Sequence, residues 1–176
     1  MTELIKFLLY LALPISFLVA CDEYETLMGD KPLQCHCSHE GKEVSPKDVG
    51  IVGEWKYDGY YKTNEFNKLP ESPHQTYGEN VFVLQLHRDN NYEGSMAPNH
   101  TPRESFMLFK GKGIQFKRVG TSDAMSQYPE WEKQFLYGLR NAECYHLFNQ
   151  NQTLYISYQP DDSQCKTMKF ERKTED

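Results

Sequence analysis

Apolar and polar positions alternate along most of the second part of the chain, and this pattern predicts short β-strands. From Gly53 to Asp58, every second residue is charged, which is the period of a strand with one buried face. Later segments repeat the signal, and Asn, Asp, Gly or Pro bound each of them. The segments predicted as strands are 51–58, 81–87, 92–96, 105–110, 113–119, 143–148, 153–159 and 166–172.

One later segment has the helical period instead. Pro129 suits the first turn of a helix, and Trp131, Phe135, Leu139 and Ala142 follow at helical spacing. We therefore predict a helix near residues 129–142. Because consecutive short strands joined by tight turns pair with their neighbours, the predicted fold is mainly β (α+β): an antiparallel sheet or partial barrel of about eight strands with one helix packed on it.

The start of the chain carries a different signal. Leu4 to Ala20 are almost all apolar, but Pro14 interrupts the run, so a cleaved signal peptide fits better than a membrane-spanning helix. The sequence Leu18-Val19-Ala20-Cys21 resembles the lipobox of bacterial lipoproteins. This resemblance implies that residues 1–20 are removed and that Cys21 becomes the acylated first residue.

Composition and charge limit what the rest of the chain does. Residues 22–48 are polar and show neither period, so we predict a lipidated cysteine and polar tether at 21–48, followed by one β domain at 49–176. Twelve Tyr, ten Phe and two Trp predict an aromatic core. The net charge of −6 disfavours binding to nucleic acid or to anionic lipid by charge.

Four cysteines follow the anchor in a chain predicted to be exported, where thiols form disulfides. They are Cys35, Cys37, Cys144 and Cys165. A bridge between Cys35 and Cys37 would be strained, so we favour a pairing in which each of these two reaches into the domain. A bridge between Cys144 and Cys165 is the competing pair, and the sequence does not choose among the connectivities.

Two of these cysteines belong to the densest cluster of metal-ligand side chains in the sequence. Cys35, His36, Cys37 and His39 are weak candidate ligands for Zn or Cu(I). Their spacing differs from the Cys-x-x-Cys of zinc and haem motifs, so we favour cystines over a metal site. No nucleophile elbow, zinc-protease motif or Walker loop is present, and we predict neither enzymatic activity nor a cofactor.

Aromatic residues of the first predicted strand and of the helix allow two interpretations. Trp55 and Tyr57, with Trp131 and Phe135, most simply form two halves of one core. If the sheet closes as in a lipocalin, the same side chains line a pocket for a small apolar ligand and the helix lies outside.

The order of the elements resembles the META domain, the fold of the heat-shock lipoprotein HslJ, over residues 50–173. The matching features are the opening Gly53-Glu54-Trp55, the strand from Phe82, Val119-Gly120-Thr121 before the helix, and the two closing strands, at 154–158 and 168–173. The Gly-Cys-Asn motif of HslJ-type domains is replaced by Met96-Ala97-Pro98-Asn99, which places Asn99 in the equivalent position. The family is not known for catalytic chemistry.

Together these features predict a non-catalytic envelope lipoprotein with a binding or stress-related role. The membrane, reached through acylated Cys21, and an envelope protein are the predicted partners. Asp22 and Glu23 after the cysteine resemble sorting signals, and the META-like resemblance favours the outer membrane or the cell surface. The alternatives are a lipocalin-like carrier of a small hydrophobic ligand and an inhibitor of a wall-degrading enzyme or protease.

Overall fold

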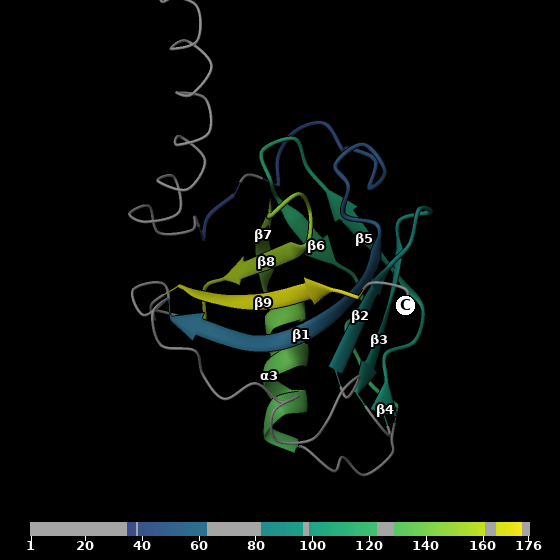
Figure 1. Cartoon of the computed structure of the whole chain (residues 1–176), viewed down its shortest axis with the longest axis vertical. Helices are drawn as coiled ribbons and strands as arrows, with labels where there is room; N and C mark the ends of the chain where they lie inside the picture. Colours follow the sequence, from purple (N-terminus) through teal and green to yellow (C-terminus); the bar gives the residue numbers. More distant parts are fainter. Residues whose placement is uncertain are drawn as a thin grey trace, which may run out of the picture. The chain divides into compact units, whose positions relative to one another are not determined.

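The computed structural model describes residues 35–37, 39–62, 82–96, 99–122, 129–160 and 165–173, so the predicted signal peptide, Cys21 and the first part of the tether lie outside the described residues. The described part forms a nine-stranded sheet with one helix (Figure 1). Its elements are β1 (Gly53–Lys62), β2 (Phe82–Leu86), β3 (Asn91–Met96), β4 (Asn99–His100), β5 (Glu104–Leu108), β6 (Ile114–Phe116), α3 (Pro129–Arg140), β7 (Ala142–Phe148), β8 (Thr153–Tyr158) and β9 (Lys166–Arg172).

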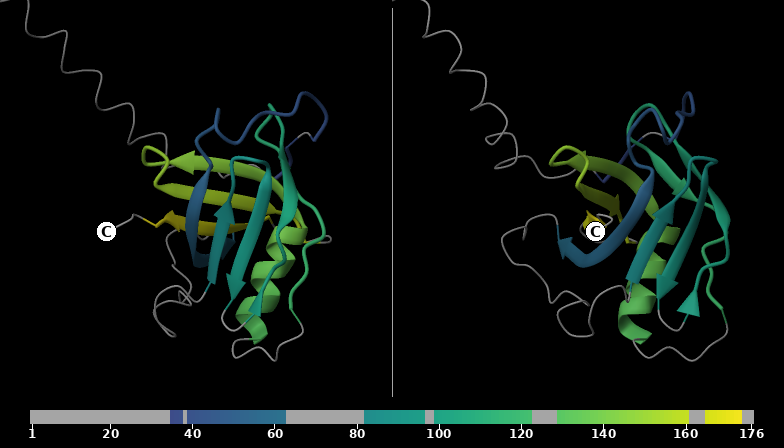
Figure 2. Two further views of the ribbon diagram at one scale, coloured as in Figure 1. Left: turned by 90° about the vertical axis from the view of Figure 1, so that its right-hand side faces the viewer. Right: turned by 45° about the vertical axis from the view of Figure 1, so that its right-hand side comes forward.

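The sheet curls until its two end strands meet. Its strand order is β6-β5-β3-β2-β1-β9-β8-β7, with β4 paired to β3, and the ladders are antiparallel. Between the end strands, Gly113 and Cys144 form an antiparallel bridge, and the Tyr145 N–H donates to the Lys112 carbonyl at 2.9 Å. Figure 2 shows the resulting curvature. The structure thus confirms the predicted mainly β fold: a nearly closed barrel with one helix packed on it.

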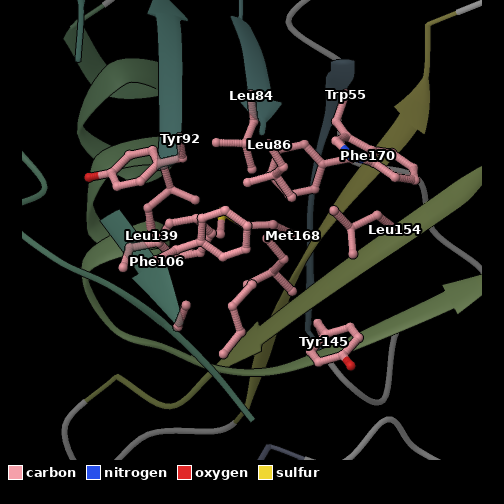
Figure 3. Close-up of a cluster of buried hydrophobic side chains, with 14 of the residues drawn as sticks. Trp55, Leu84, Leu86, Tyr92, Phe106, Leu139, Tyr145, Leu154, Met168 and Phe170 are labelled. Atoms are coloured by element: carbon pink, nitrogen blue, oxygen red, sulfur yellow. The ribbon is translucent and has the colours of Figure 1, made fainter. Parts of the chain in front are cut away.

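Aromatic side chains fill the space between the sheet and the helix. Trp55 and Tyr57 are fully buried, as their alternation predicts. The Phe135 ring of α3 lies 5.3 Å from the ring centre of Tyr57, 5.9 Å from that of Phe82 and 6.2 Å from that of Phe170. Figure 3 shows the same arrangement for further buried side chains, which converge from several strands and from the helix. The helix therefore supplies part of the core.

Two glycines allow close approaches that a side chain would block. Gly53, at the start of β1, has φ of 148°, and a Cβ atom there would collide with the guanidinium of Arg172. A Cβ atom on Gly138 would collide with the Met168 side chain and lie 3.1 Å from the Tyr158 ring. Gly138 therefore lets α3 lie directly on β8 and β9.

The observed elements differ from the predicted ones in several places, and β6 in particular is shorter than predicted, at Ile114–Phe116. The helix ends at Arg140, where the Asn141 side-chain amide caps the Tyr137 carbonyl at 2.8 Å, and Ala142 starts β7. β1 continues to Lys62 through a register shift that local periodicity does not reveal. β4 lies between the predicted strands 92–96 and 105–110, and its two residues are too few to show a period. Among the described residues, no helix has both the length and the apolar character needed to cross a bilayer.

Arg172, at the end of β9, holds three segments together with one guanidinium. Its Nη1 and Nη2 donate to the carbonyl oxygens of Val52 and Gly50, both at 2.8 Å, and its Nε donates to the Asn151 carbonyl at 2.7 Å. The guanidinium also lies 4.2 Å from the ring centre of Trp55, within the range of a cation–π interaction. Burial lowers the pKa of Arg172 from its ordinary value, yet a guanidinium stays charged at any physiological pH.

Replacing this guanidinium should destabilise the fold. We expect Arg172→Met to lower the free energy of unfolding by about 2 kcal/mol or more, because it removes three charge-assisted hydrogen bonds and the contact with Trp55. Arg172→Lys should restore little, since an ammonium cannot reproduce the planar fork. Urea denaturation measures the change, with exposed Arg118→Met as the matched control. Equal stability of Arg172→Met and Arg118→Met would contradict this role.

The buried tyrosines should make the fold sensitive to alkali. Burial raises the pKa of Tyr92, Tyr145, Tyr155 and Tyr158 above the ordinary value. A raised pKa in the folded state adds stability that is fully present below the unfolded value of about 10 and is lost as the pH rises above it. We expect the free energy of unfolding to fall above about pH 10, by at most about 1.4 kcal/mol per pH unit for each tyrosine.

Denaturation curves at increasing pH, with phenolate absorbance as a second signal, measure this effect. Tyr158→Phe removes one of the four groups and should make the decline shallower. An unchanged slope in that variant, or full ionisation of all tyrosines while the protein is still folded, would show that these phenols are not held neutral by the fold.

Candidate functional site

The four cysteines form two disulfides that fix the start of the described chain to the barrel. Cys35 pairs with Cys165, with Cα atoms 5.7 Å apart, and Cys37 pairs with Cys144, with Cα atoms 5.3 Å apart. Both early cysteines thus reach into the domain, which is the favoured arrangement. The competing bridge between Cys144 and Cys165 is not formed.

The chain from Cys35 to Val44, here called the strap and described except for residue 38, spans the seam between β6 and β7. At one side of the seam, Cys37 is bonded to Cys144 of β7. At the other side, the Val44 N–H donates to the Leu108 carbonyl at 2.9 Å, and Glu43 forms a β-bridge with Phe109. These residues fall in the range 21–48 that is predicted to be a tether. In the structure they link β7 to the hairpin of β5 and β6.

The two strap histidines face β7 and the hairpin of β5 and β6. His36 Nδ1 lies 3.1 Å from Glu143 Oε2, and His39 Nε2 lies 3.0 Å from the Glu143 carbonyl oxygen. The His39 ring also stacks on Phe109, with ring centres 5.4 Å apart. Both histidines among the candidate metal ligands are therefore held by contacts with Glu143. The group that it brings together is Cys37, Cys144 and His146, whose ligand atoms lie within 4.8 Å of one another.

The buried acidic residue at the start of the helix has a structural role. Glu132, in the first turn of α3, is buried, and its carboxylate accepts hydrogen bonds from Asn99 Nδ2 at 3.0 and 3.2 Å and from Thr121 Oγ1 at 3.3 Å. Ser122 Oγ donates to the Asn99 side chain at 3.0 Å. Because a buried carboxylate is costly unless it is hydrogen-bonded, this network fixes the start of the helix to β4. Glu130 is exposed on the opposite face.

A cleft of about 750 Å³ opens where the start of β1 meets the ends of β2 and β9. These three strand ends meet because β1 is antiparallel to both of its neighbours. The turn after β2 and the segment before β5 complete the wall. The lining residues are Val52, Gly53, Glu54, Gln85, Leu86, His87, Arg88, Asp89, Arg103, Arg172 and Lys173.

The cleft carries an excess of positive charge on a chain with a net charge of −6. Its acids are already paired: Lys173 Nζ lies 2.6 Å from Glu54, and Arg103 Nη2 lies 2.7 Å from Asp89. Arg88 is exposed and forms no ion pair with any residue that the structure describes. The cleft thus offers cationic donors that an anionic group can reach.

Hydrogen bonds also fix the acid at the edge of this cleft. The Asn91 side chain, followed by the Arg103 guanidinium, holds the pKa of Asp89 below its ordinary value. Asp89 therefore stays ionised and keeps Arg103 in place at neutral pH.

A smaller groove of about 330 Å³ continues from the cleft over the outer face of the sheet. The two hollows share Glu54 and Gln85, which are paired residues of β1 and β2. Gly94 of β3 and His100 of β4 lie further along the groove. Glu54 and Glu93 make the charged part of this groove acidic, so the positive charge of the cleft does not continue along this sheet face.

No local sequence pattern marks the cleft. Its cations follow the ends of β2 and β9 and precede β5, so positions such as Arg88, Arg103 and Lys173 are far apart in the chain. The only local signal is a charged residue directly after a predicted strand, as at Arg88 and Lys173, and this signal is also typical of ordinary solvated turns.

No protein-family model matches this chain, and no curated protein matches it either.

Proposed function

We propose that this protein is a non-catalytic envelope lipoprotein that binds an anionic envelope component in the cleft beside β1. The observation that carries the proposal is the positive excess of the cleft, with exposed Arg88, on an otherwise acidic protein. The lipobox-like sequence at Cys21 supports the membrane anchor, and the META-like order of elements supports a binding domain of this kind.

The chemistry of the cleft favours a phosphate- or carboxylate-bearing ligand. Arg103 and Arg172 present guanidinium groups, and a guanidinium has the geometry to bind such anions with two hydrogen bonds. Most hydrogen-bonding capacity of Arg172 is used within the fold, so Arg88, Arg103 and Lys173 are the residues expected to bind the ligand. Partly exposed pairs such as Lys173 with Glu54 contribute little, and an incoming anion can compete with the carboxylate at small cost.

The packing of the interior supports an external site over an enclosed, lipocalin-like pocket. The rings of Tyr57, Phe82, Phe135 and Phe170 contact one another where a lipocalin-like ligand would lie. A small hydrophobic ligand would need to displace the helix, which would expose the buried Phe135 and Leu139. The cost of that exposure disfavours the carrier function.

Calorimetric titration with tripolyphosphate and with hexagalacturonate tests the anion site. We expect salt-dependent binding, and we expect Arg88→Gln and Lys173→Gln each to weaken it by roughly fivefold or more, because each removes one cation from the cleft. Lys133→Gln is the matched control, since Lys133 is exposed on α3 outside the cleft. Absence of binding to both probes, or equal weakening in the control, would overturn the anion site.

Fractionation and labelling with palmitate test the anchor separately. We expect the protein to incorporate the label and to remain in the membrane fraction after a salt wash. Cys21→Ala should abolish the label, because the acylated thiol is gone, and should leave the precursor unprocessed. If Cys21→Ala is processed normally and is retained equally in the membrane fraction, the lipoprotein part of the proposal is wrong.

A further inference from the structure

Three metal-ligand side chains meet beneath the strap, at a place that the proposed function does not use. Cys144 and His146 are two residues apart on β7 and so share one face of the strand, while the inward Tyr145 between them belongs to the core. The strap brings Cys37 to the same face. The ligand atoms of Cys37, Cys144 and His146 all lie within 4.8 Å of one another.

We propose that reduction of the Cys37–Cys144 disulfide converts this place into a binding site for a thiophilic cation, with Zn²⁺ as the expected occupant. Two thiolates and one imidazole form a ligand set that zinc uses in proteins, with bonds of about 2.3 Å to sulfur and about 2.0 Å to nitrogen. Ligands of one ion stand roughly 3.5 to 4 Å apart in a tetrahedron of this size. The two sulfur atoms are bonded in the oxidised protein, so after reduction they must move apart to this distance, while the Cα atoms start 5.3 Å apart. Water completes the fourth position.

The redox chemistry needs a dithiol reductant, such as the active-site dithiol of a thiol–disulfide oxidoreductase. The dithiol transfers two electrons and two protons to the Cys37–Cys144 bond and becomes a disulfide itself. Zn²⁺ then displaces the two thiol protons and bonds to both sulfur atoms. The two thiol protons are released to solvent, and the metal stays divalent throughout.

The metal would join the same two chain segments as the disulfide. In the oxidised protein, the Cys37–Cys144 bond fastens the strap to β7. In the reduced protein, a zinc ion held by Cys37 from the strap and by Cys144 and His146 from β7 would restore that connection. His36 and His39 are not part of the set, because both contact Glu143.

A cobalt titration tests the site with a spectroscopic readout. The full chain carrying Cys21→Ala, Cys35→Ser and Cys165→Ser is purified in detergent, reduced with a phosphine and titrated with Co²⁺. We expect one equivalent to bind with a thiolate charge-transfer band and the visible absorption of a tetrahedral ion, and Zn²⁺ should displace it. His146→Ala should weaken binding by about tenfold or more, whereas His100→Ala, exposed and distant in the sheet, should leave it unchanged.

A second measurement uses the natural cysteines and does not depend on the folding of the variants. In the reduced protein without substitutions, Zn²⁺ should slow alkylation of Cys37 and Cys144 but not of Cys35 and Cys165, as read by peptide mass spectrometry. The proposal is overturned if all four thiols react at the same rate with and without Zn²⁺. It is also overturned if His146→Ala binds Co²⁺ with unchanged affinity and spectrum.

Discussion

Closing the seam between β6 and β7 is the constraint on which the rest of the structure depends. A curled sheet whose end strands do not meet fully leaves backbone donors and acceptors without partners, and such edges invite pairing with other chains. Within the described residues, direct pairing across the seam is short: it consists of the Gly113–Cys144 bridge and the hydrogen bond from Tyr145 to Lys112. The strap covers this weak point, with a covalent bond on one side and backbone hydrogen bonds on the other.

A second constraint acts where β1 begins, and it links the core to the cleft. The Arg172 guanidinium lies on the buried Trp55 ring and holds the carbonyl groups of Gly50 and Val52. The same side chain forms part of the cleft wall. This guanidinium therefore fixes the part of the cleft wall that is formed by the start of β1 and the end of β9.

The sequence predicted those parts of the fold in which one face of an element is buried. The alternation around Trp55 and the helical spacing that includes Phe135 reflect burial directly, so the strands, the helix and the antiparallel class followed from them. β4 has two residues and carries no periodic signal. The exact disulfide pairing and the cleft could not be predicted, because both depend on which strands and loops meet after the sheet has curled. Local sequence patterns do not contain that information.

The bond between Cys35 and Cys165 determines how the domain bears mechanical load. Traction on the chain ahead of Cys35 passes through this cross-link to the residue just before β9, which lies between β1 and β8 inside the sheet. The load then acts along two hydrogen-bonded ladders at once, and the strap is not peeled off residue by residue.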